Sequence, residues 1–207
     1  LNTVLKRFGF GDKTNIDIPN EKSGLIATAQ WKMKNHKKKW YQGETAITAI
    51  GQGYTLATPI QLALATAKLI NQDYLLQPKL LKIDTIPSHI TPSIISSEQN
   101  TNIKLVKDGM SLVTQEGGTA AFISRNSSYN MSAKTGTAQV FSLKKDEVYD
   151  ESKLPDKLKD HALFIAYAPT EEPRLVIAIV VENGGHGGST AGPIAKKVFD
   201  AYLSGVK

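Results

Sequence analysis

Two short apolar runs near the end of the chain restrict its fold more than any other feature. Residues 161–169 read HALFIAYAP, and residues 174–185 read RLVIAIVVENGG. Both are strand-sized and rich in residues that favour strands, and only TEEP separates them. Runs with this spacing predict an antiparallel hairpin. We therefore expect an antiparallel sheet in the last third of the chain.

The segments on either side of the hairpin supply a third strand and a covering helix. Residues 129–141, YNMSAKTGTAQVF, predict a strand, and residues 142–160 form a polar insertion. Residues 192–203, GPIAKKVFDAYL, predict an amphipathic helix with Pro193 near its first position. This order indicates an α+β fold, an antiparallel sheet with packed helices.

The earlier part of the chain is mainly helical by pattern. The run TPIQLALATAKLINQ begins with Thr58 as N-cap, Pro59 next and Gln61 as in a capping box, and its apolar body predicts a buried central helix. Residues 97–116 predict an amphipathic helix. Its apolar face carries four residues, Ile103, Val106, Met110 and Val113. We find no repeats and expect residues 1–207 to be part of a single domain.

Lys134, Thr135, Gly136 and Thr137 are unusual within a strand. Glycine weakens a strand interior, and a lysine there needs water or a partner. At a strand edge the lysine could hold a carboxylate or activate a hydroxyl, and the threonine hydroxyls are neutral donors. Glycine leaves room for a ligand backbone, and the N–H of Thr137 could donate to a developing oxyanion. The tetrad is the candidate catalytic and substrate-binding site.

Other patterns give weaker candidates for chemistry. The four histidines lack metal-binding spacing, so we expect no metal site and no cofactor. The chain has no cysteine, which excludes thiolate catalysis. GGSTA, at residues 187–191, approaches the G-x-S-x-G pattern of serine hydrolases, but no histidine follows Ser189. GGHGG, at residues 184–188, lacks the spacing of a phosphate-binding loop.

Part of the net charge of +6 lies in one run, WKMKNHKKKW, at residues 31–40. Its lysines could hold phosphates while Trp31 or Trp40 stacks on a base, so a basic binding module is the alternative from another functional class. A solvated loop anchored by its two tryptophans explains the same run without a ligand. We favour this second interpretation and expect no nucleic-acid partner.

In its position before an apolar hairpin, K-T-G-T resembles the third motif of the penicillin-recognising serine transpeptidases and β-lactamases. The resemblance covers nearly the whole chain, because three further segments are similar to class B penicillin-binding proteins. These segments are RFGFGDKTNIDIPNEKSG, WYQGETAITAIGQGYTLATPIQLA and VVENGGHGGSTAGPIAKKVFDAYL. WYQGET, AIGQGY and ENGGHGG resemble the elongation-specific members rather than the division-specific ones. Asn15 stands where the family usually has glycine, and asparagine tolerates the left-handed backbone that such a turn needs.

The resemblance implies a peptidoglycan D,D-transpeptidase of cell elongation, with a β-lactamase or β-lactam-sensor domain as the alternative within the fold. Such transpeptidases acylate a serine with the penultimate D-alanine of a stem peptide, and β-lactam antibiotics mimic D-Ala-D-Ala. It implies that Lys134 contacts the nucleophile and that Thr135 and Thr137 hold the substrate carboxylate. The Thr137 N–H would form half of the oxyanion hole, and Gly136 would keep the cleft open. It also implies elongation-related membrane proteins as partners and a periplasmic domain anchored in the bacterial inner membrane.

The same resemblance implies two further motifs, S-x-x-K and S-x-N, which precede K-T-G in the family. Matches to S-x-x-K begin at Ser142, in the polar insertion, and at Ser204, at the chain end, and neither has a buried helix to hold it. Matches to S-x-N begin at Ser124 and Ser128, too close to Lys134 to face it across a cleft. We therefore expect the true motifs upstream of residue 1, an incomplete helical half of the fold, and no activity from these 207 residues alone.

Overall fold

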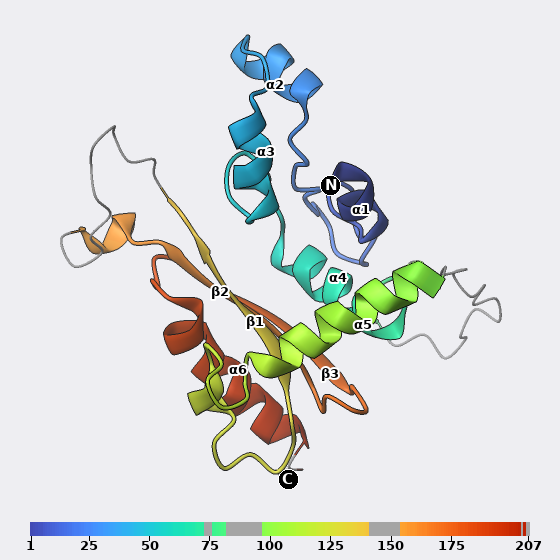
Figure 1. Cartoon of the computed structure of the whole chain (residues 1–207), viewed down its shortest axis with the longest axis vertical. Helices are drawn as coiled ribbons and strands as arrows, with labels where there is room; N and C mark the ends of the chain where they lie inside the picture. The colour runs from blue at the N-terminus through green and yellow to red at the C-terminus, as the bar shows by residue number, and fades with distance from the viewer. Residues whose placement is uncertain (73–75, 82–96, 141–153, 204, 206–207) are drawn as a thin grey trace. The chain divides into compact units, whose positions relative to one another are not determined.

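The computed structural model describes residues 1–72, 76–81, 97–140, 154–203 and 205. It divides into two compact units, Leu1–Ile95 and Ser96–Lys207 (Figure 1). The first unit contains helices α1 (Asn2–Arg7), α2 (Ala29–His36), α3 (Gln42–Ala49) and α4 (Pro59–Asn71). The second contains helix α5 (Ser97–Leu112), the short 3₁₀ helices η1 (Ala121–Ile123) and η3 (Asp156–Leu158), strands β1 (Ser132–Ala138), β2 (His161–Ala168) and β3 (Leu175–Val181), and helix α6 (Gly187–Leu203).

The second unit is built on an antiparallel sheet with the strand order β1-β2-β3. This confirms the predicted α+β fold and the predicted hairpin, because β2 pairs with the whole of β3 from Ala162 to Ala168. Within the described residues, β1 and β3 each pair on one side only, so both are edge strands. Of the predicted polar insertion, residues 141–153 lie outside the described residues.

One face of the sheet is buried beneath α6. The side chains of Phe164 on β2 and Phe199 on α6 are fully buried, as are the small residues Ala162, Ala191 and Ala195 that let the helix approach the strands. Burial of one aromatic side chain of this kind contributes about 1.5–3 kcal/mol relative to leaving it exposed. The sheet and α6 therefore form the core that holds β1 in place.

Helix α6 begins earlier than the sequence predicts. The predicted start near residue 192, with Pro193 at the first position, is wrong: the helix runs from Gly187, and Pro193 lies in its interior. The added turn is rich in small residues, and Gly187, Gly188 and Ala191 are buried in it. Tertiary contact with the sheet therefore outweighs the low helix propensity of glycine and proline in this segment.

Helix α5 faces its core with a narrower stripe than predicted. Ile103 and Met110, two turns apart, are each only 6% exposed, whereas Val106 is 50% exposed. The prediction was therefore wrong for Val106, because the buried face follows the seven-residue spacing and Val106 lies to one side of it.

In the first unit, the N-terminus of α4 joins several segments. The predicted capping box is confirmed, since the Thr58 hydroxyl accepts from the N–H of Gln61 and the Gln61 side chain accepts from the N–H of Thr58. The same Gln61 amide donates to the carbonyls of Asp12 and Ser23, at 2.8 Å each. Gln61 is 1% exposed, so one buried amide closes the preceding connector onto the helix.

The turn at Asn15 adopts the expected backbone. Asn15 has a φ of 59°, in the left-handed region that asparagine tolerates better than most residues. The Glu21 carboxylate accepts from the N–H groups of Thr14 and Asn15, which fixes the turn. Desolvation raises the pKa of Glu21, but the hydrogen bonds from the Thr14 hydroxyl and from these two N–H groups together hold it below its usual value. The departure from the family pattern at this position is therefore accommodated locally.

Candidate active site

The K-T-G-T tetrad lies in the middle of edge strand β1. Lys134 pairs with Ile165, Thr135 with Phe164 and Gly136 with Leu163 across the β1–β2 ladder. Because side chains alternate along a strand, Lys134 and Gly136 lie on one face of the sheet. Thr135 and Thr137 lie on the opposite face, which Phe164 shares and α6 covers. The structure thus brings all four predicted residues to one edge of the sheet.

Lys134 places a positive charge at the open edge of β1. Its side chain is exposed, and its ammonium donates a 2.6 Å hydrogen bond to the carbonyl of Thr135. A carbonyl reached in this way faces the open edge rather than β2. Along an antiparallel strand, the backbone groups of every second residue point to the same side. Thr137 is two residues after Thr135, so its N–H faces the open edge as well. This edge can accept an extended peptide as an added strand.

Gly136 is closely packed by the neighbouring strand. A Cβ atom at this position would lie 3.2 Å from the Cβ of Leu163, its cross-strand partner. The glycine therefore relieves a contact within the sheet. That it also keeps a cleft open for ligand remains a prediction.

The start of β1 is fixed by three hydrogen bonds. The Thr114 hydroxyl, just after α5, donates to the carbonyl of Met131, the residue that precedes the strand. The hydroxyls of Ser132 and Thr170 lie 2.9 Å apart, and the N–H of Thr170 donates to the carbonyl of Asn130 at 3.0 Å. The candidate residues consequently stand on a strand anchored at its N-terminal end.

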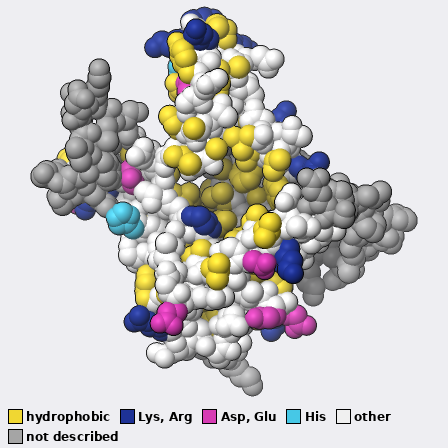
Figure 2. Space-filling model, in the orientation of Figure 1, with side chains coloured by type: hydrophobic (Ala, Val, Ile, Leu, Met, Phe, Trp, Pro, Cys, Tyr) yellow, Lys and Arg dark blue, Asp and Glu magenta, His cyan; other side chains and the backbone are white. Residues whose placement is uncertain are grey.

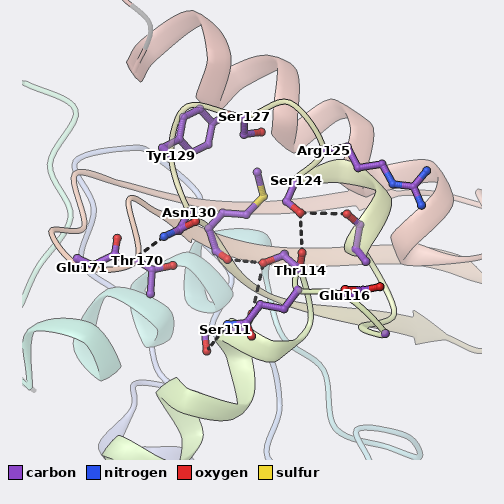
Figure 3. Close-up of a pocket in the computed structure, with 14 residues that line it drawn as sticks. Ser111, Thr114, Glu116, Ser124, Arg125, Ser127, Tyr129, Asn130, Thr170 and Glu171 are labelled. Atoms are coloured by element: carbon purple, nitrogen blue, oxygen red, sulfur yellow. Dashed lines mark hydrogen bonds between the residues drawn. The ribbon is translucent and has the colours of Figure 1, made fainter.

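A polar cavity of about 710 Å³ surrounds these anchoring contacts (Figure 3). Several of its side chains bind one another or nearby carbonyls. The Ser124 hydroxyl donates to the carbonyl of Thr114, and the Asn130 amide donates to Glu171. Because these contacts lie next to the N-terminal end of β1, we assign the cavity a supporting role for that strand. Ser124, the first residue of a rejected S-x-N match, is among the residues engaged in this way.

Tyr129, which lines this cavity, also contacts a charged pair on α6. The Tyr129 hydroxyl donates to Asp200 at 2.7 Å, and Lys196 contacts the same carboxylate. Burial, followed by the hydrogen bond to Asp200, raises the pKa of Tyr129. The hydrogen bonds from Lys196 and Tyr129 lower the pKa of Asp200.

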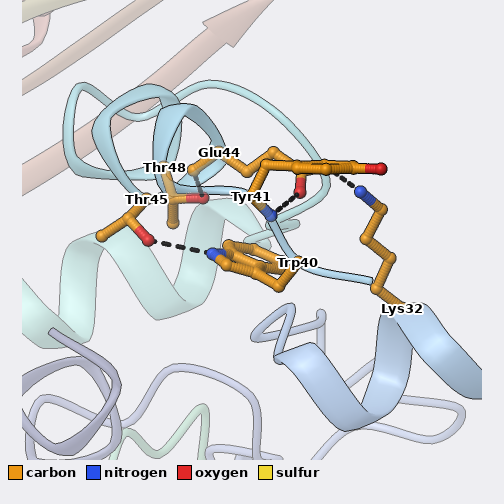
Figure 4. A network of polar contacts seen from close by, with 6 residues as sticks. All are labelled: Lys32, Trp40, Tyr41, Glu44, Thr45 and Thr48. Atoms are coloured by element: carbon orange, nitrogen blue, oxygen red, sulfur yellow. Dashed lines mark hydrogen bonds and ion pairs between the residues drawn. The ribbon is translucent and has the colours of Figure 1, made fainter. Parts of the chain in front are cut away.

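The sequence interpretation missed a buried cation. Lys32, assigned to a solvated loop, instead lies in α2, is 3% exposed and forms an ion pair with Glu44 of α3 (Figure 4). That prediction was wrong for Lys32. The ammonium lies 4.9 Å from the centre of the Tyr41 ring, and Glu44 also accepts from the N–H of Tyr41. The hydrogen bond from Lys32 is the main cause of the lowered pKa of Glu44.

The remaining lysines of the run are exposed, and Figure 2 shows them gathered at the end of the first unit that carries α2. They are Lys34, Lys37, Lys38 and Lys39. Trp31 is not an open stacking platform, because its ring lies 5.2 Å from the His36 ring and 5.4 Å from the Tyr54 ring. Half-buried tryptophans beside exposed lysines favour the anchored, solvated interpretation over a nucleic-acid site.

The described residues contain neither a candidate metal centre nor a candidate membrane span. No three histidine, aspartate or glutamate side chains gather there in a way that could hold a metal ion. Among the described helices, none has both the length and the apolar character needed to cross a membrane.

Comparison with known proteins gives matches along almost the whole chain. Residues 1–200 match the family model of the penicillin-binding protein transpeptidase domain. The peptidoglycan D,D-transpeptidase MrdA of Salmonella typhimurium is 38% identical over 208 residues, which cover 97% of this chain and 33% of that protein. The chain therefore spans about a third of the length of the curated relatives that it matches.

Solved structures agree with this match. The crystal structure of Pseudomonas aeruginosa PBP2 in complex with WCK 5153 is 37% identical, with a TM-score of 0.79, and covers 96% of this chain and 42% of that one. The complex between PBP2 and MreC from Helicobacter pylori is 33% identical, with a TM-score of 0.80, and covers 98% of this chain and 35% of that one.

Proposed function

This chain belongs to the family of penicillin-binding protein transpeptidase domains. We propose that it is part of a peptidoglycan D,D-transpeptidase and that its strand β1 binds the substrate. The predicted resemblance to elongation-type members is confirmed, since its relatives include MrdA and PBP2 proteins. The observation that carries the proposal is the placement of K-T-G-T on an anchored edge strand with the Lys134 ammonium at its open edge.

The proposed reaction is acyl transfer through a serine ester. The serine oxygen attacks the carbonyl carbon of the penultimate D-alanine, the bond to the terminal D-alanine breaks, and that amine leaves with a proton. An amine from a neighbouring stem peptide then attacks the ester and releases the serine. A β-lactam would acylate the same serine by opening its ring.

We assign the tetrad roles that fit this chemistry. Lys134 stabilises the deprotonated nucleophile and the approaching carboxylate by its charge. The hydroxyls of Thr135 and Thr137 donate to the carboxylate of the terminal D-alanine, and the Thr137 N–H donates to the oxyanion. Gly136 permits the peptide to lie against the strand. The serine is proposed to come from an S-x-x-K motif other than the two matches in this chain.

Partners and location follow from the same proposal. We propose peptidoglycan stem peptides and β-lactam antibiotics as ligands. An MreC-like protein is proposed as one partner, because a PBP2 of Helicobacter pylori is known in complex with MreC. The complete protein would be anchored in the bacterial inner membrane with this domain in the periplasm.

Replacement of Lys134 in the full-length protein tests the proposal. We expect Lys134→Ala to lower the rate of acylation by a fluorescent penicillin about 100-fold or more, because a positioned charge is lost from the reacting centre. Gel fluorescence over a time course measures the rate. Lys104→Ala, which removes an exposed lysine of α5, is the matched control. Equal labelling of wild type and Lys134→Ala would remove the lysine from the mechanism.

A further inference from the structure

The N-terminus of α6 lies directly on the candidate strand. A Cβ atom at Gly187 would lie 2.0 Å from the carbonyl oxygen of Leu163 and 3.0 Å from the nitrogen of Gly136. Real Cβ atoms do not approach backbone this closely, so only glycine fits here without displacement of the strands. The first helical residue thus contacts the ladder at the pair that contains the glycine of K-T-G-T.

The second helical residue contacts the adjacent threonine. A Cβ atom at Gly188 would lie 3.4 Å from the Cγ2 methyl of Thr135 and 3.3 Å from the carbonyl oxygen of Thr119. The Thr135 methyl therefore occupies the space beside Gly188. Threonine is restricted to few χ1 rotamers, so the position of its methyl determines where its hydroxyl points.

From these contacts we infer that Gly187 and Gly188 are positioning residues for the K-T-G-T strand. Gly187 determines how closely the backbone of Gly136 approaches the helix. Gly188 determines which rotamer Thr135 adopts, and this rotamer presents the hydroxyl to a substrate carboxylate. This inference rests on the proposed function, and it extends the site to a helix that sequence analysis placed outside it. It also explains why α6 begins with two glycines despite their low helix propensity.

Gly188→Ala in the full-length protein provides the sharper test, because its added methyl meets a side chain as well as a carbonyl. We expect acylation by a fluorescent penicillin to slow about tenfold, since small displacements of a reacting group cost rate steeply. The melting temperature should stay close to that of wild type, because contacts of 3.3–3.4 Å require only a small local adjustment. Gly43→Ala is the matched control: Gly43 is the second residue of α3, and an added Cβ there meets nothing within 4 Å.

Thr135→Ser removes the methyl and keeps the hydroxyl. In the double variant Gly188→Ala/Thr135→Ser we expect acylation to recover to within about threefold of Thr135→Ser alone, because residues in contact are energetically coupled. A penicillin methyl ester, which lacks the carboxylate, should react equally with wild type and Gly188→Ala. Gly187→Ala should give a larger rate loss than Gly188→Ala, because the atoms that it meets belong to the backbone.

The outcomes separate this inference from the proposed function. Failure of the wild-type protein to react with penicillin would overturn the proposed function itself. Normal reaction of wild type together with equal rates for Gly188→Ala and Gly43→Ala would overturn the positioning role alone. Slow acylation of Gly188→Ala that Thr135→Ser does not restore would also overturn it, since the effect would then not pass through Thr135.

Discussion

At the scale of single residues, the carboxylate of Asp200 shows how a local pairing acts on stability. Lys196 donates to both of its oxygens, at 2.9 and 2.7 Å, and Tyr129 donates to one of them. These donors favour the charged carboxylate, which lowers the pKa of Asp200 below the ordinary 3.8. Because the folded-state pKa is depressed, Asp200 contributes stability above pH 3.8, and this contribution is lost as the pH falls through the folded-state pKa.

We therefore expect Asp200→Asn to be less stable than wild type at neutral pH and to lose less stability on acidification. The asparagine can still accept a hydrogen bond but has no charge that titrates. Urea unfolding at a series of pH values from 7 downward through 3.8 measures both effects. Asp108→Asn, on the exposed side of α5, is the charge-matched control. Parallel pH curves for wild type and Asp200→Asn would contradict the assignment.

The residues differ in how far their sequence revealed them. Lys134 and Gly136 could be recognised as candidate site residues because both are unfavourable inside a strand unless the strand has another use. Lys32 could not, since its burial depends on Glu44, which belongs to a different helix. Gly187 and Gly188 resembled an ordinary turn, because their contacts with Leu163 and Thr135 exist only after the sheet has formed.

At the scale of elements, those with local signals were predicted best. The β2–β3 hairpin and the capped start of α4 depend on short-range patterns, and both were confirmed. The predicted start of α6 was wrong because the prediction relied on the low helix propensity of one proline and several glycines. Tertiary packing stabilises the helix despite these residues. Helix α4 shows the converse, since its capping residue Gln61 also holds the connector that precedes it.

We expect Gln61→Leu to destabilise the chain by about 2–4 kcal/mol, because the carbonyls of Asp12 and Ser23 and the N–H of Thr58 lose the buried amide that binds them. The leucine keeps most of the side-chain volume, so the loss reports the hydrogen bonds rather than a cavity. Chemical denaturation measures the free energy of unfolding. Gln30→Leu makes the same change at an exposed position of α2. Similar stabilities for the two variants would show that Gln61 does not join these segments.

At the scale of the whole molecule, fold class and family were readable from the sequence because its motifs extend from the first helix to the last. The nucleophile could not be located in the same way. The two S-x-x-K matches begin at Ser142 and Ser204, outside the described residues, so their rejection still rests on sequence context. Labelling by a fluorescent penicillin therefore tests whether the 207 residues contain a reactive serine.

We expect the 207-residue chain, produced by itself, to form no stable adduct with a fluorescent penicillin, whereas the full-length protein should be labelled. The reason is that K-T-G-T supplies charge and hydrogen bonds but no serine within a suitable motif. Mass spectrometry of both proteins after incubation provides the measurement. A serine-linked adduct on the 207-residue chain would return Ser142 or Ser204 to consideration, and peptide mapping would identify which.

Strand β3 has a consequence for handling the protein. Its seven residues, LVIAIVV, contain no charge and no proline, and within the described residues only β2 pairs with it. A long apolar strand with an unpaired edge can act as a template on which a second chain adds a strand. Preparations of these residues alone should therefore be prone to β-rich aggregation, and their solubility depends on what covers that edge.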